Sequence, residues 1–283
     1  MDRLDWTAID KIIDLALEED LGSGDITTHS TVSSRAWGKG SIIARKKVVV
    51  AGLFLVDRLY RQLDSGVQVE VITQDGSRAR TGDVLCNISG PYQALLSGER
   101  VVLNLLQRTC GIATYAARYA RAVKGTEATV FDTRKTTPGM RTLDKYAVRT
   151  GGAANHRMGL FDALLIKENH IAAAGGVDKA INLARKAHPE ATLEIEVQNL
   201  EELVLATEYG ADIVLLDNMT PVQVRKAVRL VGKRVQLEVS GGVTLKNVKE
   251  MAATGVPRIS VGALTHSAPA ADLSMLLLPA RKP

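Results

Sequence analysis

The apolar and polar positions of the chain follow two rhythms, and the change falls near residue 125. Before it, apolar residues at helical spacing predict three helices, over residues 7–20, 53–64 and 93–123. Short apolar runs bounded by turn residues predict three strands, over residues 40–50, 67–72 and 83–88. Helices and strands alternate irregularly in this part, so we expect a small α/β domain.

After residue 125 the rhythm becomes regular. Six short apolar runs predict strands, over residues 128–132, 163–166, 192–197, 212–216, 235–239 and 257–261. Helical patterns lie between them, over residues 144–154, 178–187, 200–208, 221–230 and 244–253. Such alternation indicates a parallel sheet with helices outside it. A closed β/α barrel has about eight such units, so this chain is expected to form an open, incomplete β/α barrel.

Polar residues at the ends of these strands are the strongest sign of a functional site. Each strand end carries a reactive or phosphate-binding residue type: Thr133, Lys167, Glu196, Asp217, Ser240 and Gly262. The carboxyl ends of parallel strands meet at one mouth, where the active sites of such folds lie. One charged strand end would be ordinary solvated surface, but a whole series of them predicts a binding site.

Four basic side chains would make this mouth positive: Arg134, Lys135, Arg157 and Lys167. Arginine binds carboxylate or phosphate groups in a bidentate manner, and lysine adds a point charge. We therefore expect a ligand with several negative groups. The alternative, for any one of these side chains taken singly, is a surface ion pair.

Two glycine-containing segments, LEVSGGVTL (237–245) and ISVGALTHS (259–267), follow the last two strands. Exposed amide groups and helix starts bind phosphate well, and the late loops of β/α barrels are its usual site. Ordinary tight turns would use the same glycines. The position of the pair, rather than either segment alone, predicts a phosphate site.

Carboxylates and histidines complete the candidate chemistry. Glu196 and Asp217 end neighbouring strands, and carboxylates beside a polyphosphate favour Mg²⁺ or contacts to sugar hydroxyls. They could instead neutralise the basic cluster. His156 and His170 could serve as general acid or base, or as hydrogen-bonded structural residues. The residues alone thus point to a phosphorylated sugar, a magnesium ion and a second anionic substrate.

Composition and charge narrow the class of protein. The net charge of +5 is too small to predict nucleic-acid binding, and no Lys/Arg-rich run accompanies it. No apolar run approaches the ~20 residues of a membrane span, and the acidic, amphipathic start is unlike a signal peptide. Cys86 and Cys110 lack metal-type spacing, so we expect free thiols in a reducing cytoplasm.

Several long motifs resemble the quinolinate phosphoribosyltransferase family, also called carboxylating nicotinate-nucleotide pyrophosphorylases. In chain order they are ALEEDLGSGDIT, ERVVLNLLQRTCGIAT, DTRKTTPGMRTLDKYAVRTGGAANHRMGLFDALLIKENHI, LEIEVQNLEEL, DIVLLDNMTP, LEVSGGV and GVPRISVGALTHS. The resemblance covers nearly the whole chain. It implies that quinolinate and phosphoribosyl pyrophosphate give nicotinate mononucleotide, CO₂ and pyrophosphate, with Mg²⁺ as cofactor, in de novo NAD biosynthesis.

The resemblance also implies an architecture. An N-terminal α/β sandwich is expected over residues 1–112, joined by the C-terminal segment 266–283, and an open β/α barrel over residues 113–265. In this family the sandwich of one subunit covers the barrel mouth of another. A homodimer or larger homo-oligomer with shared sites is therefore expected, with no nucleic acid or membrane as a partner.

The site residues carry over from the motifs. The groups implied to bind the two carboxylates of quinolinate are Arg100 of the partner subunit, Arg134, His156 and Arg157. Thr133 lies beside them, and Lys135 and Lys167 add charge for quinolinate or the diphosphate.

The same resemblance implies groups for the second substrate. Glu196 and Asp217 would hold the ribose hydroxyls and the Mg²⁺ on the diphosphate, and with Lys135 they form the expected catalytic set. The backbone expected to bind the 5′-phosphate belongs to Ser240, Gly241, Gly242, Val261, Gly262 and Ala263.

Three other functions fit part of this pattern. A related phosphoribosyltransferase would use nicotinate or another ring acid, although the extra cations favour a dicarboxylate. A Schiff-base aldolase would use Lys167 as its nucleophile. A regulatory protein on the same scaffold would bind phosphoribosyl pyrophosphate without turning it over.

Overall fold

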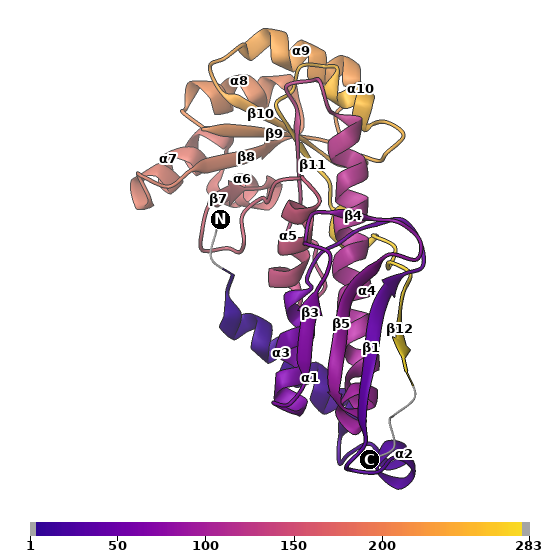
Figure 1. Ribbon diagram of the computed structural model, residues 1–283. Coiled ribbons are helices and arrows are strands. Elements are labelled where there is room, and N and C mark those ends of the chain that lie inside the picture. The colour runs from indigo at the N-terminus through magenta and orange to yellow at the C-terminus, as the bar shows by residue number, and fades with distance from the viewer. Residues whose placement is uncertain (1–3, 279–283) are drawn as a thin grey trace. The chain divides into compact units, whose positions relative to one another are not determined.

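The structure is a computed structural model that describes residues 4–278, and it divides into two compact units (Figure 1). The first unit contains the chain up to Ala117, the segment Thr136–Gly152 and the chain from Thr265 onward. The second contains Arg118–Lys135 and Ala153–Leu264. Each unit is therefore built from segments that are separated in the sequence.

The first unit contains a four-stranded antiparallel sheet with the order β12-β1-β5-β3. Its strands are β1 (Trp37–Ala44), β3 (Gln68–Val71), β5 (Val84–Pro91) and β12 (Leu273–Leu277). A small ladder pairs β2 (Val48–Val49) with β4 (Arg78–Ala79). The strand expected over 40–50 is thus divided, because exposed residues 45–47 separate β1 from β2. Strand β12, which pairs with β1, ties the C-terminal segment to this unit.

Five helices belong to the first unit: α1 (Trp6–Leu21), α2 (Ile26–Thr31), α3 (Phe54–Leu63), α4 (Tyr92–Ala122, whose last turn enters the second unit) and α5 (Arg141–Thr150). Helix α1 begins where the Asp5 side chain accepts a hydrogen bond from the Ala8 N–H, the usual role of an N-cap. Its apolar face buries Ile9 and Ile13 in a core shared with α3, α4 and the sheet.

The compact units do not follow the sequence boundary expected at residue 112, because α4 continues unbroken past it. Gly111 does not interrupt this helix. A Cβ there would lie 2.3 Å from the carbonyl oxygen of Pro269, so glycine allows a close backbone approach. Residues 136–152, expected in the barrel, also group with the first unit. Leu143 is buried in its core and the Asp144 carboxylate binds Arg108 at 2.7 and 2.8 Å.

The second unit contains the predicted six-stranded parallel sheet, in the order β6-β11-β10-β9-β8-β7. Its strands are β6 (Thr129–Phe131), β7 (Leu164–Ile166), β8 (Leu193–Val197), β9 (Ile213–Asp217), β10 (Gln236–Ser240) and β11 (Arg258–Ser260). Among the described residues, β6 and β7 form the two edges and do not pair with each other. The sheet is therefore open, as the sequence predicted.

Five helices connect β7 to β11 within the described residues: α6 (Glu168–Ala174), α7 (Val177–Ala187), α8 (Leu200–Glu208), α9 (Pro221–Val231) and α10 (Val248–Ala252); a sixth, α11 (Ala263–His266), follows β11. Figure 1 shows α8, α9 and α10 beside the sheet in the orange part of the chain. Helix α10 is shorter than expected, because Thr244 N–H bonds the Asn247 side chain in a turn before it. The short helices α6 and α11 were not predicted.

The two faces of the parallel sheet differ in chemistry. On β8, Ile195 and Val197 are fully buried on one face, whereas Glu194 and Glu196 point to the other. The register continues this second face across the sheet, because Glu196 pairs with Leu215, Leu215 with Glu238, and Glu238 with Arg258. The face with Glu194 and Glu196, which we call the inner face, therefore carries charged groups. The opposite, outer face packs as apolar core.

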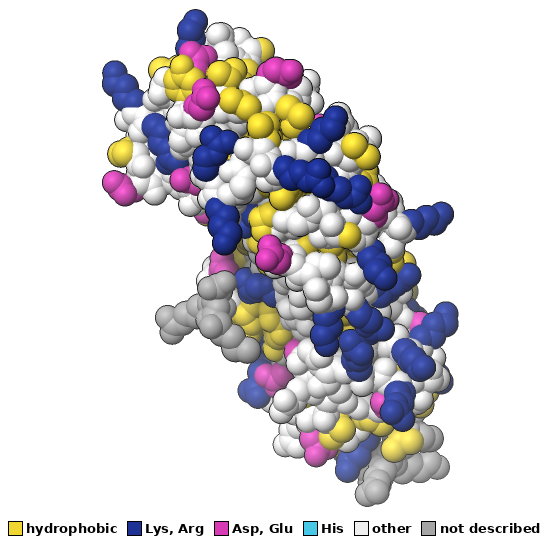
Figure 2. Space-filling view, turned by 90° about the horizontal axis from the view of Figure 1, so that it is seen from above, with side chains coloured by type: hydrophobic (Ala, Val, Ile, Leu, Met, Phe, Trp, Pro, Cys, Tyr) yellow, Lys and Arg dark blue, Asp and Glu magenta, His cyan; other side chains and the backbone are white. Residues whose placement is uncertain are grey.

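No helix within residues 4–278 is long and apolar enough to cross a membrane. Figure 2 shows the basic side chains of one face as separate groups, with acidic and apolar side chains between them. The candidate site therefore has to be located from the arrangement of individual side chains, because charge is spread widely over this surface.

Candidate active site at the carboxyl ends of the parallel strands

The structure brings the predicted strand-end residues of the second unit to one edge of its sheet. Six of them lie within two residues of the carboxyl ends of β6 to β11: Thr133, Lys167, Glu196, Asp217, Ser240 and Gly262. Because all neighbouring strands are parallel, these ends share one edge. Asp217 lies directly opposite Ser240 in the register. The predicted mouth is thus present as a row of strand ends.

Lys167 and Glu196 form an ion pair between neighbouring strand ends. The lysine side chain is 45% exposed and the glutamate 14%, so the pair lies at the surface of the mouth. Lys167 is also the residue before α6, where its backbone N–H donates to His170 Nδ1 at 2.9 Å. His170 therefore has a structural role at the start of α6, which was one of the two possibilities its sequence position left open.

Two arginines of this edge, Arg134 and Arg157, repel each other electrostatically. Arg157 is partly buried, and its Nη1 donates to the Ala163 carbonyl at 3.0 Å. Burial and the neighbouring Arg134 both lower the pKa of Arg157, with Glu194 and Asp162 acting in the opposite direction. Like charges held near one another are relieved by an anion. The pair therefore favours a negatively charged ligand.

His156 lies below these arginines, between two carboxylates that the sequence reading did not select. Its Nε2 is 3.0 Å from Glu194 Oε2 and 3.4 Å from Glu238 Oε1. Its Nδ1 accepts the backbone N–H of Arg157 at 2.8 Å. Both ring nitrogens thus have partners within the chain. A signal existed in the sequence, since acidic residues alternate with apolar ones in LEIEV and would share the inner face of a strand.

Further groups hold Glu238 in place. Arg258 Nε donates to Glu238 Oε2 at 2.7 Å, and Ser260 Oγ donates to Glu238 Oε1. The Arg258 guanidinium also stacks over the Phe131 ring at 3.9 Å from its centroid. Burial raises the pKa of Glu194, whereas the Glu238 pKa is lowered, because its bonds to His156, Arg258 and Ser260 together outweigh burial.

The imidazole of His156 keeps a proton more strongly than a free histidine. Burial acts to lower its pKa, but the hydrogen bonds and charges of Glu194 and Glu238 raise it to about 9. The Arg157 N–H points at Nδ1, so the ring hydrogen is on Nε2. The extra proton therefore belongs to the coupled Glu194–His156 pair, and placing it on Nδ1 would break the bond to Arg157.

The turn after β10 is shaped by glycine and by Asn218. Gly241 and Gly242 have φ values of +92° and +59°. A Cβ on Gly241 would lie 2.1 Å from Asn218 Oδ1. Asn218 itself has φ of +54°, the one positive value at a non-glycine residue within the described chain. Its backbone N–H bonds the Ser240 carbonyl and its side chain donates to Asp217 Oδ2 at 2.8 Å. The sequence reading missed Asn218.

The second predicted phosphate segment differs from the first. Val261 is buried, and its N–H donates to the Phe131 carbonyl at 2.9 Å. That amide is therefore committed to joining β11 to β6 and is not available to a phosphate. Gly262 and Ala263 are partly exposed and lead into α11. The Ser240–Gly242 turn, Gly262 and Ala263 remain the candidate backbone contacts.

Glu196 and Asp217 are the two carboxylates predicted to hold a magnesium ion. Glu196 and Asp217 both offer hard oxygen ligands at the edge of the sheet, which suits Mg²⁺ held by few protein groups and by substrate phosphates. Each already has a partner, Lys167 and Asn218 respectively. The chemistry fits an ion bound mainly through the substrate. Arg100, by contrast, is exposed on α4 in the first unit.

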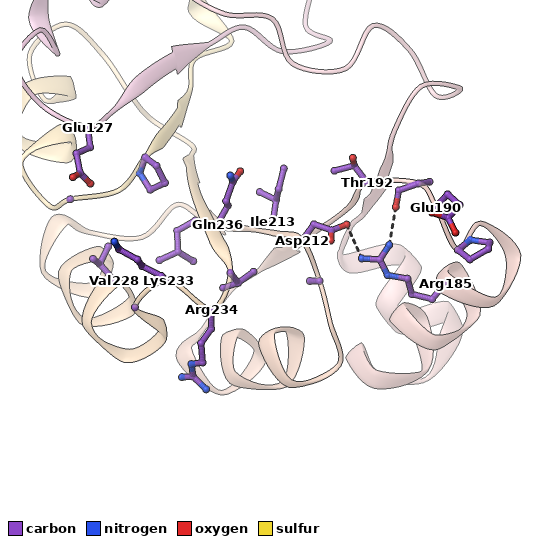
Figure 3. A pocket seen from close by; sticks show the side chains of 18 residues that line it. Glu127, Arg185, Glu190, Thr192, Asp212, Ile213, Val228, Lys233, Arg234 and Gln236 are labelled. Carbon is purple, nitrogen blue, oxygen red and sulfur yellow. Dashed lines mark hydrogen bonds and ion pairs between the residues drawn. The ribbon is translucent and has the colours of Figure 1, made fainter.

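A hollow of about 990 Å³ lies at the opposite end of the same strands (Figure 3). Its lining comes from residues just before β8, β9 and β10, including Thr192, Asp212 and Lys233. Figure 3 shows Arg185 directed at Asp212, and the two side chains are 2.7 Å apart. None of the predicted site residues lines this hollow.

The open parallel sheet and the helices between its strands define the chain as an α/β protein whose strand ends carry basic side chains. The family model described as quinolinate phosphoribosyl transferase, C-terminal domain, matches residues 112–276. The model of the N-terminal domain matches residues 25–110. The chain therefore belongs to the quinolinate phosphoribosyltransferase family.

Individual relatives agree with this membership. The chain is 41% identical over 266 residues to a probable carboxylating nicotinate-nucleotide pyrophosphorylase of Bacillus subtilis, covering 94% of this chain and 92% of that one. It is 42% identical over 268 residues to the Mycobacterium leprae carboxylating nicotinate-nucleotide pyrophosphorylase, with 92% and 94% covered. The crystal structure of NadC from Streptococcus pyogenes matches with a TM-score of 0.95, 38% identity and full coverage of both chains.

Proposed function

We propose that this chain catalyses transfer of phosphoribose from phosphoribosyl pyrophosphate to quinolinate, with decarboxylation to nicotinate mononucleotide. The structural observation that carries the proposal is the row of predicted residues at the carboxyl ends of the parallel strands, where the charge of Arg134 also lowers the pKa of Arg157. Two guanidinium groups suit the two carboxylates of quinolinate, because each binds a carboxylate in a bidentate manner. Family membership supplies the identity of the substrates.

Quinolinate is proposed to lie against the arginines, with Lys135 and Lys167 adding positive charge. Lys167 is paired with Glu196, so its ammonium is already directed to the mouth. Thr133 accepts the backbone N–H of Lys135 at 3.0 Å, which orders the turn after β6. The ring of the substrate would thus be fixed by charged groups that come from different strand ends.

Phosphoribosyl pyrophosphate is proposed to occupy the other half of the edge. Asp217 and Glu196 would hold the ribose hydroxyls, and the turn at Ser240–Gly242 would bind the 5′-phosphate through exposed amides. The same two carboxylates would hold Mg²⁺ together with the diphosphate. The ion would offset the negative charge that collects on the leaving pyrophosphate.

The proposed chemistry needs no covalent attachment to the protein. The ring nitrogen of quinolinate forms a bond to C1 of the ribose while the bond from C1 to the pyrophosphate oxygen breaks. Lys135 and Lys167 stabilise charge on the leaving group. The ring nitrogen is then positive, so it accepts the electron pair released when the C2 carboxylate leaves as CO₂. A proton then replaces the carboxylate at C2.

The oligomeric arrangement is part of the proposal. Arg100 is exposed on α4, and a site shared between subunits would let this residue reach the quinolinate of another subunit. Mixing Arg100→Ala chains with Lys135→Ala chains should restore part of the activity, because some of the mixed sites would then be intact. No recovery despite demonstrated subunit exchange would contradict shared sites.

We also propose a cytoplasmic location, in which Cys86 and Cys110, both buried and free, stay reduced.

The structure weighs against the aldolase alternative. A Schiff-base lysine is activated by desolvation or by a nearby cation. Lys167 instead lies against a carboxylate and is 45% exposed. Borohydride trapping of a substrate carbonyl on Lys167 would be needed to restore that alternative.

The proposed reaction is tested by mixing the pure protein with quinolinate, phosphoribosyl pyrophosphate and Mg²⁺. We expect nicotinate mononucleotide and CO₂ in equal amounts. Replacing quinolinate with nicotinate should abolish turnover, because the ring's 2-carboxylate is then missing. Turnover of nicotinate would favour the related transferase. Binding of both substrates by folded protein without either product would favour a regulatory binding protein.

A further inference from the structure

A group of buried charges lies beneath the mouth and has no part in the proposed reaction. It consists of His156, Glu194, Glu238 and Arg258, which we call the buried His–Glu cluster. The side chains of Glu194 and Glu238 are only 4% and 0% exposed. Burying charged groups carries a large desolvation cost, even when they are paired. A cluster of this kind in the floor of a site therefore calls for a functional reason.

The cluster fixes the imidazole of His156 from one side. Nε2 is held by Glu194 at 3.0 Å and lies 3.4 Å from Glu238. Glu238 is itself fixed, because Arg258 donates to its Oε2 at 2.7 Å and Ser260 to its Oε1. The ring side chain is 9% exposed. Its orientation is thus determined by groups on β8, β10 and β11 together.

The other side of the same ring determines the backbone at Arg157. Nδ1 accepts the Arg157 N–H at 2.8 Å, and the His156 N–H donates to Asp132 Oδ1 at 2.8 Å. The chain is therefore held on both sides of the His156–Arg157 peptide. From this point the Arg157 side chain reaches the Ala163 carbonyl at 3.0 Å. The imidazole links the buried acids to the place where this arginine begins.

We propose that Glu194 and Glu238 are positioning residues for the quinolinate site, acting through His156. By fixing the imidazole, they set the backbone position from which the Arg157 guanidinium reaches a substrate carboxylate. In this arrangement His156 contacts no substrate, and its ring serves as a rigid spacer. The inference rests on the proposed function, and it changes the role that the family resemblance implied for His156.

Two substitutions of the histidine separate positioning from direct substrate contact. The amide oxygen of His156→Asn can occupy the place of Nδ1 and accept the Arg157 N–H, while the contact to the acids is lost. His156→Gln can reach toward Glu194 but leaves the Arg157 N–H without its acceptor. Because either change leaves an amide in the same cavity, the two variants serve as controls for each other.

If the proposal holds, His156→Gln should raise the dissociation constant and KM for quinolinate by about tenfold, the effect of losing one hydrogen bond that holds the Arg157 backbone. His156→Asn should raise them much less. KM for phosphoribosyl pyrophosphate should not change in either variant. Equal loss of quinolinate binding in both variants would overturn the proposal, because it would indicate a direct contact made by the whole imidazole.

A second pair of variants tests the acids. Glu194→Gln retains an oxygen that can accept from Nε2 and should keep most quinolinate affinity, whereas Glu194→Ala should lose it as His156→Gln does. Glu208→Gln, an exposed change on α8, is the matched control. A fall in kcat or thermal stability with unchanged quinolinate affinity in Glu194→Ala would overturn the proposal, because the acid would then be only structural.

Measurements on the unmodified protein distinguish failure of the proposed function from failure of the positioning role. If it neither binds nor turns over quinolinate, the proposed function fails, and the positioning role fails with it. If it does both, and all four variants bind quinolinate as it does, the positioning role alone fails.

Discussion

The two ends of the six-stranded sheet both carry many charged side chains, but they use them differently. At the amino end, Arg185 donates to the carbonyls of Ala191 and Gly210 and to Asp212, and Arg234 donates to two carbonyls at the end of α9. At the carboxyl end, Arg134 is close enough to lower the pKa of Arg157. The amino-end arginines bond backbone carbonyls and Asp212 within the fold, whereas the carboxyl end gathers the basic side chains that are expected to bind substrate.

This difference shows that the size of a hollow does not identify a site. The amino end has the hollow of about 990 Å³, yet its arginines are committed to backbone carbonyls and to Asp212. The carboxyl end combines like charges, a lysine–glutamate pair and a glycine turn with positive φ. The positive φ of Asn218 is a kind of backbone strain found at functional sites, and a bound anion would offset the effect of Arg134 on Arg157, so we expect the chemistry at this end.

Removing a carboxyl-end arginine is expected to have the largest effect. Arg134 is exposed in the free chain, so the estimate applies to the complex: Arg134→Ala should weaken quinolinate recognition by about 2–5 kcal/mol, the usual cost of leaving a bound carboxylate buried without its partner. Measured kcat/KM for quinolinate gives this value directly. Unchanged kinetics would remove Arg134 from the site and weaken the contrast between the two ends.

Raising the pH should lower the free energy of unfolding, because the proton held by His156 and its acidic partners is then lost. The pKa of His156 is raised to about 9 by Glu194 and Glu238, against the opposing effect of burial. A raised pKa contributes stability that is fully present below about pH 6.5, its usual value, and that is lost as pH rises through about 9. The loss should reach at most about 3 kcal/mol.

Denaturant unfolding of the unmodified protein and of His156→Gln, followed from neutral to alkaline pH, measures this loss. The difference in the free energy of unfolding between the two should shrink as pH rises. A difference that stays constant would show that the buried pair does not hold the extra proton. No corresponding effect is expected from the arginines of the amino end, which stay charged in this range.

Adding a side chain to the glycine turn should have a smaller effect, mainly on the binding of phosphoribosyl pyrophosphate. Gly241 has φ of +92°, and a Cβ there would lie 2.1 Å from Asn218 Oδ1. Gly241→Ala should therefore cost about 1–3 kcal/mol in strain and displace the amide that holds Asp217. KM for phosphoribosyl pyrophosphate should rise more than KM for quinolinate. Gly232→Ala, at another positive φ with nothing near its Cβ position, is the control.

The smallest effect on activity is expected at the amino end. Arg185→Met removes the bonds to Asp212 and to two carbonyls, so thermal stability should fall by an amount typical of a partly exposed pair, about 1 kcal/mol. The kinetic constants of the remaining folded enzyme should not change. A selective loss of substrate binding in Arg185→Met would show that the amino end takes part in the reaction.

The sequence predicted the strands and the edge where their ends meet, because apolar runs and strand-end residues are local signals. Residues such as Lys167 and Asp217 could be chosen in this way. The segments that make up the first unit were harder to predict, since α5 joins this unit through Asp144 and Arg108, which are distant in the chain. No periodicity encodes such a pairing.

The sequence did not predict a role for Glu194, Glu238 or Asn218, for a related reason. Glu194 and Glu238 lie inside strands, whereas the candidate residues were chosen at strand ends. Their role depends on the register that brings them beside His156. Asn218 was missed because its positive φ is a property of the folded turn. The sequence thus predicted candidate residues at the strand ends, whereas the partners of His156 inside the strands could be identified only from the structure.

The most direct test is a crystal structure of the protein with quinolinate bound. The account predicts that the two carboxylates of the ligand lie against Arg134 and Arg157 at the carboxyl ends of the strands, with the His156 ring beneath them and still bonded to the Arg157 N–H. Quinolinate bound in the hollow beside Asp212 and Lys233, with the strand-end arginines unoccupied, would contradict it.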